Sequence, residues 1–260
     1  MSKYVLGIDI GSTASKCVIL NDSKEIVAKA VVDVGAGTSG PKRALEAVLK
    51  DAGLKREDIS YVLATGYGRN SSEFDADSQM SELSCHAAGA AYLFPDVSTV
   101  IDIGGQDVKV LSVENGMLMN FQMNDKCAAG TGRFLDVMAR VLEVKVDELA
   151  ALGAKAEKVV PISSTCTVFA ESEVISQLAK GTDKNSIIAG IHQAVATKVV
   201  GLAHRVGIKD RLVMTGGVAL NGGVVKALEE QLGKEISTSE LTQFAGALGA
   251  AIYALRKIER

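Results

Sequence analysis

The sequence predicts an α/β protein made of two related domains. Short apolar segments of strand type alternate with helical patterns along the 260 residues, an arrangement typical of α/β folds. The segment 8–16 (IDIGSTASK) recurs without gaps at 101–109 (IDIGGQDVK), with the same residue at five of the nine positions. Because one domain is typically ~150 residues long, the length also favours two domains over one.

Each expected element has its own local signal. The strands are short runs rich in Val, Ile and Leu, several of which end at Asp-x-Gly or Thr-Gly. The helices carry apolar residues three and four positions apart, and the first of them ends before Gly53, a favoured stop residue. In chain order, the expected strands are 4–10, 15–20, 27–34, 61–65, 97–103 and 212–215. The expected helices are 41–52, 80–92, 133–142, 169–178, 186–206 and 244–257.

Composition argues against several classes of function. Hydrophobic residues make up 47% and charged residues 23% of the chain, which provides for a substantial core and excludes a disordered chain. A net charge of −3 gives no reason to expect nucleic acid as a partner. An aromatic content of 4% without Trp argues against base stacking. The longest uninterrupted apolar stretch, 244–255, has 12 residues against ~20 for a membrane span, so no membrane span is expected.

The chain is expected to be cytoplasmic. Asp9 interrupts the N-terminal segment before the apolar core of a signal peptide could form. In the cytoplasm, the four cysteines are expected to be reduced thiols or ligands and not disulfides. Cys17 in a strand and Cys85 in a helix are expected to be packing residues, which leaves Cys127 and Cys166 as candidate ligands.

Each copy of the repeat places an aspartate at a strand end, followed by a glycine turn. Glycine lets the backbone approach a ligand and expose N–H groups that can hold phosphate oxygens. Asp9 and Asp102 could each organise a hydrated Mg²⁺ ion. Lys16 could balance phosphate charge, whereas Lys109 is expected to be a solvated strand residue. Gln106 could orient an attacking water molecule.

A third glycine element, 213–221 (VMTGGVALN), is a short apolar strand that ends in Gly-Gly before a helix start. Such a turn can bring its backbone close to a nucleotide base or ribose. The sequence contains neither a P-loop nor a Gly-x-Gly-x-x-Gly fingerprint. The segments 6–13 (LGIDIGST), 100–105 (VIDIGG) and 215–218 (TGGV) resemble the first phosphate, second phosphate and adenosine motifs of the actin, hexokinase and heat-shock-chaperone ATPase superfamily.

That resemblance implies two ribonuclease-H-like domains with ATP in the cleft between them. The N-terminal domain would be 1–97, with the C-terminal helix 244–260 packing back on it, and the C-terminal domain would be 98–243. Asp9 and Asp102 would hold Mg²⁺, usually through water. Gln243 is a further nucleotide candidate. The positions expected to take phosphates or adenosine are Gly11, Ser12, Thr13, Ala14, Ser15, Lys16, Gly104, Gly105, Gln106, Gly216 and Gly217.

Two cysteines lie in segments that precede predicted helices. Cys127 stands in the Gly-rich segment 124–136 (NDKCAAGTGRFLD), and Cys166 follows 39 residues later in 162–173 (ISSTCTVFAESE). A helix N-terminus favours thiolate over thiol. Two thiolates are half of the set that a [4Fe–4S] cluster takes, so two chains could supply four. Zinc could use the same four thiolates, and two ordinary half-buried cysteines are the remaining alternative.

Five segments together resemble the ATP-dependent activators of 2-hydroxyacyl-CoA dehydratases, whose relatives include ATPase subunits of benzoyl-CoA reductase. They are most similar to the activators that serve (R)-2-hydroxyglutaryl-CoA dehydratase, and the resemblance covers residues 4–255. The segments are 64–69 (ATGYGR), 82–90 (ELSCHAAGA), 102–107 (DIGGQD), 126–132 (KCAAGTG) and 164–172 (STCTVFAES).

The resemblance implies a homodimer with one [4Fe–4S] cluster between the subunits, held by Cys127 and Cys166 of each. Reduced ferredoxin or flavodoxin would load one electron, and ATP hydrolysis would drive it into the dehydratase component of an anaerobic amino-acid fermentation. There the electron would reduce the acyl-CoA to a ketyl radical anion. A change of ~59 mV in a one-electron potential equals about 1.4 kcal/mol, so changes around such a cluster can alter electron donation appreciably.

Two other functions are compatible with the same scaffold. A small-molecule or acid kinase would transfer phosphate to an acceptor and would need no iron. A nonenzymatic actin-like or chaperone-like module would use its ATP cycle to move partners or to build filaments. The two cysteine segments favour the activator over both alternatives.

Overall fold

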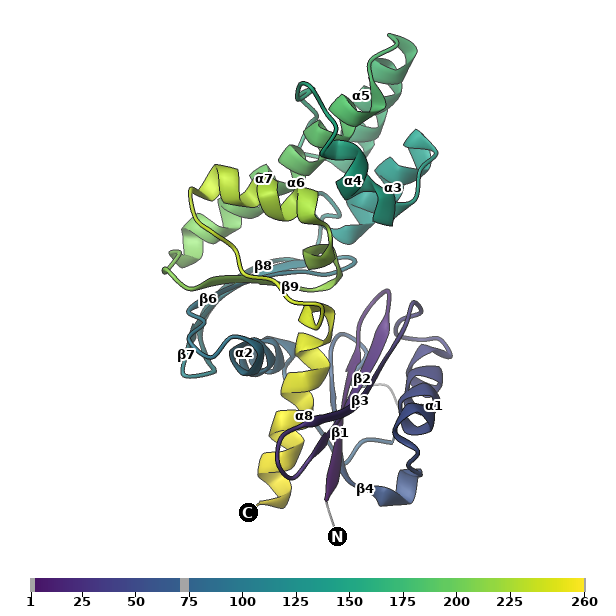
Figure 1. Ribbon diagram of the computed structural model, residues 1–260, viewed down its shortest axis with the longest axis vertical. Helices are drawn as coiled ribbons and strands as arrows, with labels where there is room; N and C mark the ends of the chain where they lie inside the picture. The colour runs from purple at the N-terminus through teal and green to yellow at the C-terminus, as the bar shows by residue number, and fades with distance from the viewer. Residues whose placement is uncertain (1–2, 71–74, 260) are drawn as a thin grey trace. The chain divides into compact units, whose positions relative to one another are not determined.

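The structure, a computed structural model, describes residues 3–70 and 75–259. These residues form two compact units, each with its own sheet and helices (Figure 1). Unit 1 consists of residues 1–97, 113–119 and 243–260, and unit 2 consists of residues 98–112 and 120–242. Segment 113–119, which was expected in the C-terminal domain, is part of unit 1.

Unit 1 is built on a five-stranded mixed sheet with the order β3-β2-β1-β4-β5. β1 pairs antiparallel with β2 and parallel with β4, so that Asp9 lies between Lys16 and Thr65 on the two neighbouring strands. The strands are β1 (Tyr4–Ile10), β2 (Ser15–Asn21), β3 (Ile26–Val32), β4 (Ile59–Thr65) and β5 (Ser78–Gln79).

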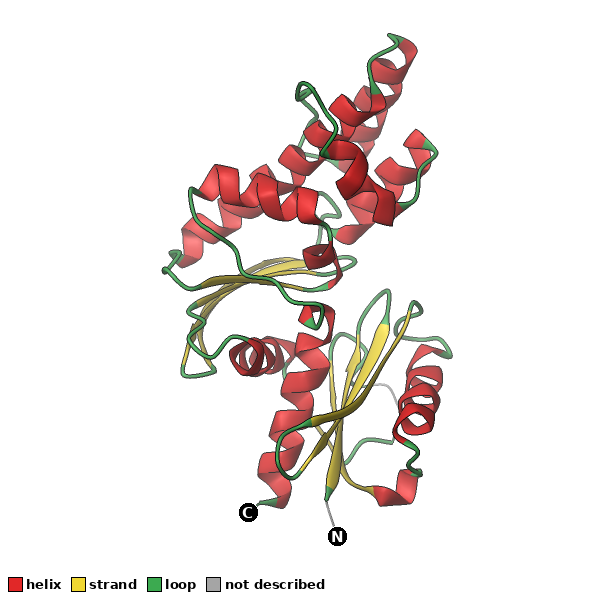
Figure 2. Cartoon of the chain, in the orientation of Figure 1, coloured by secondary structure: helices red, strands yellow, loops and turns green. Residues whose placement is uncertain are grey.

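Helices cover both faces of this sheet (Figures 1 and 2). α1 (Gly40–Ala52) packs on β2 and β3, begins with a proline in its first turn, and ends at Gly53 in the left-handed conformation. α8 (Ala245–Ile258) packs on β1, β2 and β4, and also on α2 (Glu82–Leu93). A 3-10 turn, η1 (Arg56–Asp58), leads into β4. The apolar side chains of these elements form the core of the unit.

Unit 2 has a four-stranded sheet with the order β8-β7-β6-β9. β6 pairs antiparallel with β7 and parallel with β9, which repeats the arrangement of β1, β2 and β4. Asp102 consequently lies between Lys109 and Thr215. The strands are β6 (Thr99–Ile103), β7 (Val108–Glu114), β8 (Met117–Asn124) and β9 (Leu212–Thr215).

The helices of unit 2 share one large core with its sheet. α6 is long and apolar enough to cross a membrane by length and composition, with a mean hydropathy of 1.3 over its apolar stretch. However, 67% of that stretch is buried inside the protein, as in the core helix of a globular domain. The helices are α3 (Gly132–Leu142), α4 (Leu149–Gly153), α5 (Thr167–Ala179), α6 (Lys184–Val206) and α7 (Gly222–Leu232). The 3-10 turns are η2 (Val146–Glu148), η3 (Gly217–Leu220) and η4 (Thr242–Phe244).

Candidate functional site

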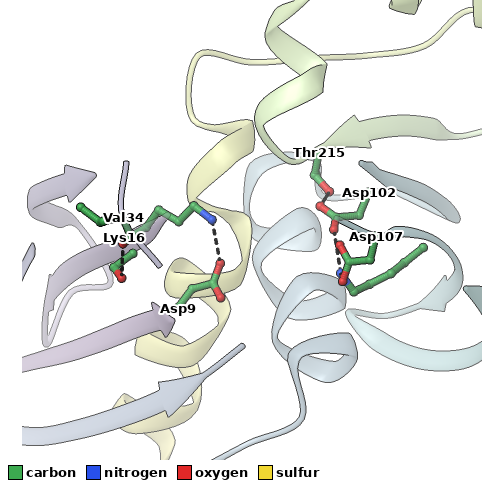
Figure 3. A network of polar contacts seen from close by, with 8 residues as sticks. Asp9, Lys16, Val34, Asp102, Asp107 and Thr215 are labelled. Carbon is green, nitrogen blue, oxygen red and sulfur yellow. Dashed lines mark hydrogen bonds and ion pairs between the residues drawn. The ribbon is translucent and has the colours of Figure 1, made fainter. Parts of the chain in front are cut away.

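Asp9 occupies a tightly enclosed position at the end of β1. Its side chain is buried, with 5% of the residue exposed, and its Oδ2 atom is 3.4 Å from the Nζ of Lys16 (Figure 3). Gly66, at the end of the parallel strand β4, has a φ of +88°, and a Cβ placed there would collide with Asp9 Oδ1. A side chain at position 66 is therefore disfavoured both by the backbone conformation and by contact with the carboxylate.

Asp102 occupies the corresponding position at the end of β6 and is 1% exposed. Its Oδ1 accepts a hydrogen bond of 2.7 Å from the Thr215 hydroxyl, and its Oδ2 is 3.5 Å from the Nζ of Lys109 (Figure 3). Lys109 also forms a 2.7 Å ion pair with Asp107 and is 3% exposed. The expectation that Lys109 is solvated is therefore wrong, because this lysine is buried and pairs with two carboxylates.

The duplicated element is larger than the nine residues that the sequence shows. In both units, a third strand runs parallel to the Asp-bearing strand and ends in Thr-Gly, with the glycine at positive φ: Thr65-Gly66 in unit 1 and Thr215-Gly216 in unit 2. The detectable signal was the Thr-Gly pair itself, present in the segments 64–69 and 213–221. That the two Thr-Gly pairs occupy equivalent positions in the two units becomes visible only from the register of the strands.

The first turn, 11–14, is partly exposed and is closed by a hydrogen bond of 3.0 Å from the N–H of Gly11 to the carbonyl of Ala14. Ser12 and Thr13 lie within it and are also partly exposed. Ser15 differs, since it is completely buried and its hydroxyl donates to the carbonyl of Val34 at 2.9 Å. The Ser15 side chain thus fastens β2 to the chain that follows β3.

The second turn is hydrogen-bonded to the start of α3. The N–H groups of Gly132 and Arg133 donate to the carbonyls of Gly104 and Gly105, at 2.9 and 2.8 Å. The neighbouring Gln106 is exposed. The turn also closes on itself, because Gly104 donates to the carbonyl of Asp107 at 3.0 Å. Two of the first free N–H groups of α3 are thereby satisfied within unit 2.

The third glycine element leads from β9 through η3 into α7. Gly216 has a φ of +85°, and a Cβ placed there would collide with the carbonyl of Ile103 and lie 3.1 Å from Asp102 Oδ1, so this position also requires glycine. Its N–H donates to the carbonyl of Thr242 at 3.2 Å. Gly217 has open space around its Cα. Gln243 lies in η4 and is half-buried.

Cys127 and Cys166 are both free, partly exposed thiols of unit 2. Cys166 is the N-cap residue of α5, and its carbonyl accepts the N–H of Ala170 at 3.0 Å. Cys127 lies four residues before Thr131, the N-cap of α3, and its carbonyl accepts a 2.9 Å hydrogen bond from the Asn124 side chain. Both cysteines therefore precede helices, as the sequence predicts, but only Cys166 is itself an N-cap residue.

The other two cysteines, Cys17 and Cys85, are more deeply buried than Cys127 and Cys166. Cys17 on β2 and Cys85 on α2 are completely buried, and desolvation raises the pKa of both thiols, that of Cys85 to about 12. Both thiols are therefore protonated packing groups. Within residues 3–70 and 75–259, three or more His, Cys, Asp or Glu side chains never gather closely enough to hold a metal ion. A single chain consequently offers no complete protein-only metal site in its described part.

The two units, each with a mixed sheet that carries an Asp-Lys-Thr-Gly element, define a fold that also occurs in sugar kinases. A glucokinase of the ROK family from Streptomyces griseus, crystallised with glucose and AMPPNP, shares the fold with a TM-score of 0.59 at 14% identity, covering 97% of this chain and 99% of that one.

The chain belongs to the BadF/BadG/BcrA/BcrD ATPase family, whose model matches residues 6–254. It is 70% identical to the (R)-2-hydroxyglutaryl-CoA dehydratase activating ATPase of Acidaminococcus fermentans over 99% of both chains. The crystal structure of component A of that dehydratase superimposes with a TM-score of 0.97 over 100% of both chains at 69% identity. The activator of the 2-hydroxyisocaproyl-CoA dehydratase from Clostridium difficile, solved with bound ADPNP, gives 0.96 at 53% identity, covering 98% of this chain and 96% of that one. The resemblance inferred from the sequence motifs is thus confirmed.

Proposed function

We propose that this chain is the ATP-dependent activator of an (R)-2-hydroxyglutaryl-CoA dehydratase, to which it donates single electrons at low potential. The observation that carries the proposal is the 70% identity to an activating ATPase of that name over 99% of both chains. The chain also contains a free cysteine in each of the two segments that set this family apart from kinases on the same scaffold.

The nucleotide site of this proposal uses the two carboxylates and the three glycine turns. Asp9 and Asp102 are each already paired with a lysine and are nearly buried, so they fit a Mg²⁺ ion held through water better than one coordinated directly. Gln106, which is exposed at the second turn, would orient the attacking water. The phosphates and the adenosine would be held by Gly11, Ser12, Thr13, Ala14, Lys16, Gly104, Gly105, Gly216, Gly217 and Gln243. Ser15 would act by holding the first turn, since its hydroxyl already donates to Val34.

The cysteines of this proposal fit half of a cluster site. Cys127 and Cys166 are partly exposed thiols, and the helices α3 and α5 that follow them pack against each other. Two such chains supply the four thiolates that a [4Fe–4S] cluster needs, and this cluster supplies one-electron reducing chemistry when bound. Val168 and Phe169, two and three residues after Cys166, are 64% and 61% exposed and provide apolar surface suited to burial against a second copy.

Nucleotide and cysteines would communicate through unit 2. The backbone of Gly104 and Gly105 accepts hydrogen bonds from the first residues of α3, and Cys127 precedes that helix. A shift of the second turn on ATP hydrolysis would therefore also move the loop that carries Cys127. Ferredoxin or flavodoxin would be the reductant, and the reaction would take place in the cytoplasm.

The test is anaerobic activation of the purified dehydratase. The chain, reductant and ATP should together start dehydration of (R)-2-hydroxyglutaryl-CoA, and a non-hydrolysable ATP analogue should not. A Cys166→Ser variant serves as the control that retains the nucleotide residues. Oxygen-free protein that is monomeric and free of iron, yet activates fully, would contradict the proposal.

A further inference from the structure

Helices α2 and α8 of unit 1 approach each other unusually closely. A Cβ has no room at Gly89 of α2, because the carbonyl of Ala245 occupies the space where it would lie. At Gly249 of α8, the carbonyl of Cys85 occupies the corresponding space. Such glycine contacts bring two helix backbones closer together than side chains would allow. The crossing therefore places a short stretch of α2 against the first turns of α8.

This close crossing brings His86 next to Asp9. Both are nearly buried, with 7% and 5% of the residue exposed. A Cβ built on Gly246 of α8 would be 2.9 Å from His86 Nε2 and 3.0 Å from Asp9 Oδ2. The imidazole and the carboxylate therefore converge on the space that the missing side chain of Gly246 leaves open.

The two aspartates are held by different neighbours. Thr215 donates its hydroxyl to Asp102 at 2.7 Å, whereas the equivalent Thr65 donates to the carbonyl of Met80 at 3.0 Å. His86 comes from a helix and stands on the Oδ2 side of Asp9, where Lys16 also points. An imidazole N–H is a suitable donor for a carboxylate, and groups behind a metal-binding carboxylate fix its orientation.

We propose that His86 is a positioning residue that orients the Asp9 carboxylate toward the hydrated metal of the nucleotide site, and that Gly246 is required to leave room for the pair. This inference rests on the proposed function, in which Asp9 holds Mg²⁺ through water. His86 itself touches neither nucleotide nor metal in this arrangement.

The test compares ADP binding to the full-length protein with Mg²⁺ in excess and with EDTA, by isothermal titration calorimetry. The ratio of the two dissociation constants isolates the contribution of the metal from that of general folding. His86→Leu, which keeps volume and removes the donor, should reduce this ratio about tenfold. His86→Gln, which restores an N–H donor, should retain most of it. His192→Leu, at a buried histidine of unit 2, is the matched control and should leave the ratio unchanged.

A second variant disturbs the same pair without substituting either of its residues. Gly246→Ala should lower the ratio as His86→Leu does, because its methyl group pushes the imidazole and the carboxylate apart. Equal ratios in His86→Leu, Gly246→Ala and the wild type would overturn the role of His86 while leaving the proposed function intact. A wild-type protein that binds no ADP, or whose ADP affinity is independent of Mg²⁺, would overturn both.

Discussion

Lys109 faces Asp102 across the antiparallel pair β6–β7, just as Lys16 faces Asp9 across β1–β2. The two pairs differ in depth, since the Lys109 side chain is 4% exposed and that of Lys16 is 17% exposed. Lys109 also neutralises Asp107, so that one buried cation supports two carboxylates. The duplicated Asp-Lys pair is thus buried in unit 2 and more accessible to solvent in unit 1.

Replacing each lysine in turn should show whether it contributes mainly to stability or to ATP binding. Lys109→Met leaves Asp102 and Asp107 without this cation and should lower the free energy of unfolding by about 3–5 kcal/mol. Lys16→Met should cost less stability and instead weaken ATP binding, because Lys16 stands at the partly exposed first turn. Urea unfolding and nucleotide titration of both variants measure the two effects. Stability losses of the same size would contradict the distinction.

Substitution of Asp102 should affect turnover without affecting the iron content. Asp102→Asn removes the negative charge proposed for the hydrated Mg²⁺ and should lower ATPase activity at least ~100-fold. The colour that the proposed cluster would give to anaerobically purified protein should stay, because Cys127 and Cys166 are untouched. Asp210→Asn, which alters an exposed ion pair with Lys234, is the control and should retain activity. Loss of colour in Asp102→Asn would show that the two sites are not separable.

Gly66 and Gly53 offer a matched pair of substitutions. Both have positive φ, +88° and +65°, so alanine at either position should cost about 1 kcal/mol of backbone strain. Only at Gly66 does the new methyl group also collide with Asp9 Oδ1 and with the carbonyl of Ile10, whereas Gly53 has open space, so Gly66→Ala should cost more stability than Gly53→Ala. Gly66→Ala should therefore also lower ATPase activity, and Gly53→Ala should retain it. Thermal unfolding and ATP hydrolysis, measured side by side, test this difference.

The cysteine residues should divide into two classes by iron analysis. Cys127→Ser and Cys166→Ser should each lack the cluster, while the wild type contains four irons per dimer. Cys17→Ala and Cys85→Ala are controls that remove buried thiols and should keep the full iron content. Iron, sulfide and mass analysis of oxygen-free protein provide the measurement. Full iron in Cys127→Ser would exclude this residue as a ligand.

Stability should fall in acid partly because of His192. Desolvation lowers its pKa in the folded protein to about 4 from an ordinary value of 6.5. The unfolded chain therefore binds the proton first, so this contribution is complete above pH 6.5 and is lost progressively as the pH falls toward 4. The loss is on the order of 3 kcal/mol. Comparison of urea unfolding at pH 7 and pH 4.5 should show a smaller decrease for His192→Leu than for the wild type. His204→Leu, at an exposed position of the same helix, should behave like the wild type.

The sequence predicts those parts of the fold whose signals are local. The strands Tyr4–Ile10 and Leu212–Thr215 occur at the predicted residues, because each is a mainly apolar run that is followed directly by a glycine. Strands β5, β7 and β8 and helices α4 and α7 are not among the elements that the sequence predicts. β8 exposes Met117, Met119 and Phe121 at its edge position, so its apolar residues do not mark a buried face.

The candidate site could be predicted in its residues but not in its contacts. Asp9 and Asp102 are recognisable from the repeat, whereas the burial of Lys109 depends on a hairpin that directs it back onto Asp102 and Asp107. The approach of His86 to Asp9 depends on a glycine more than 150 residues away on α8. Long-range packing of this kind leaves no periodic pattern in the chain.

The two peptide hydrogen bonds that join α3 to the Gly104-Gly105 turn limit how that helix can move. A helix fixed at its first turn by backbone groups cannot slide along its axis or rotate about it unless both bonds break or the turn travels with it. We therefore expect a displacement of the turn to move the first turn of the helix with it. Coupling through backbone hydrogen bonds of this kind does not depend on a flexible side chain.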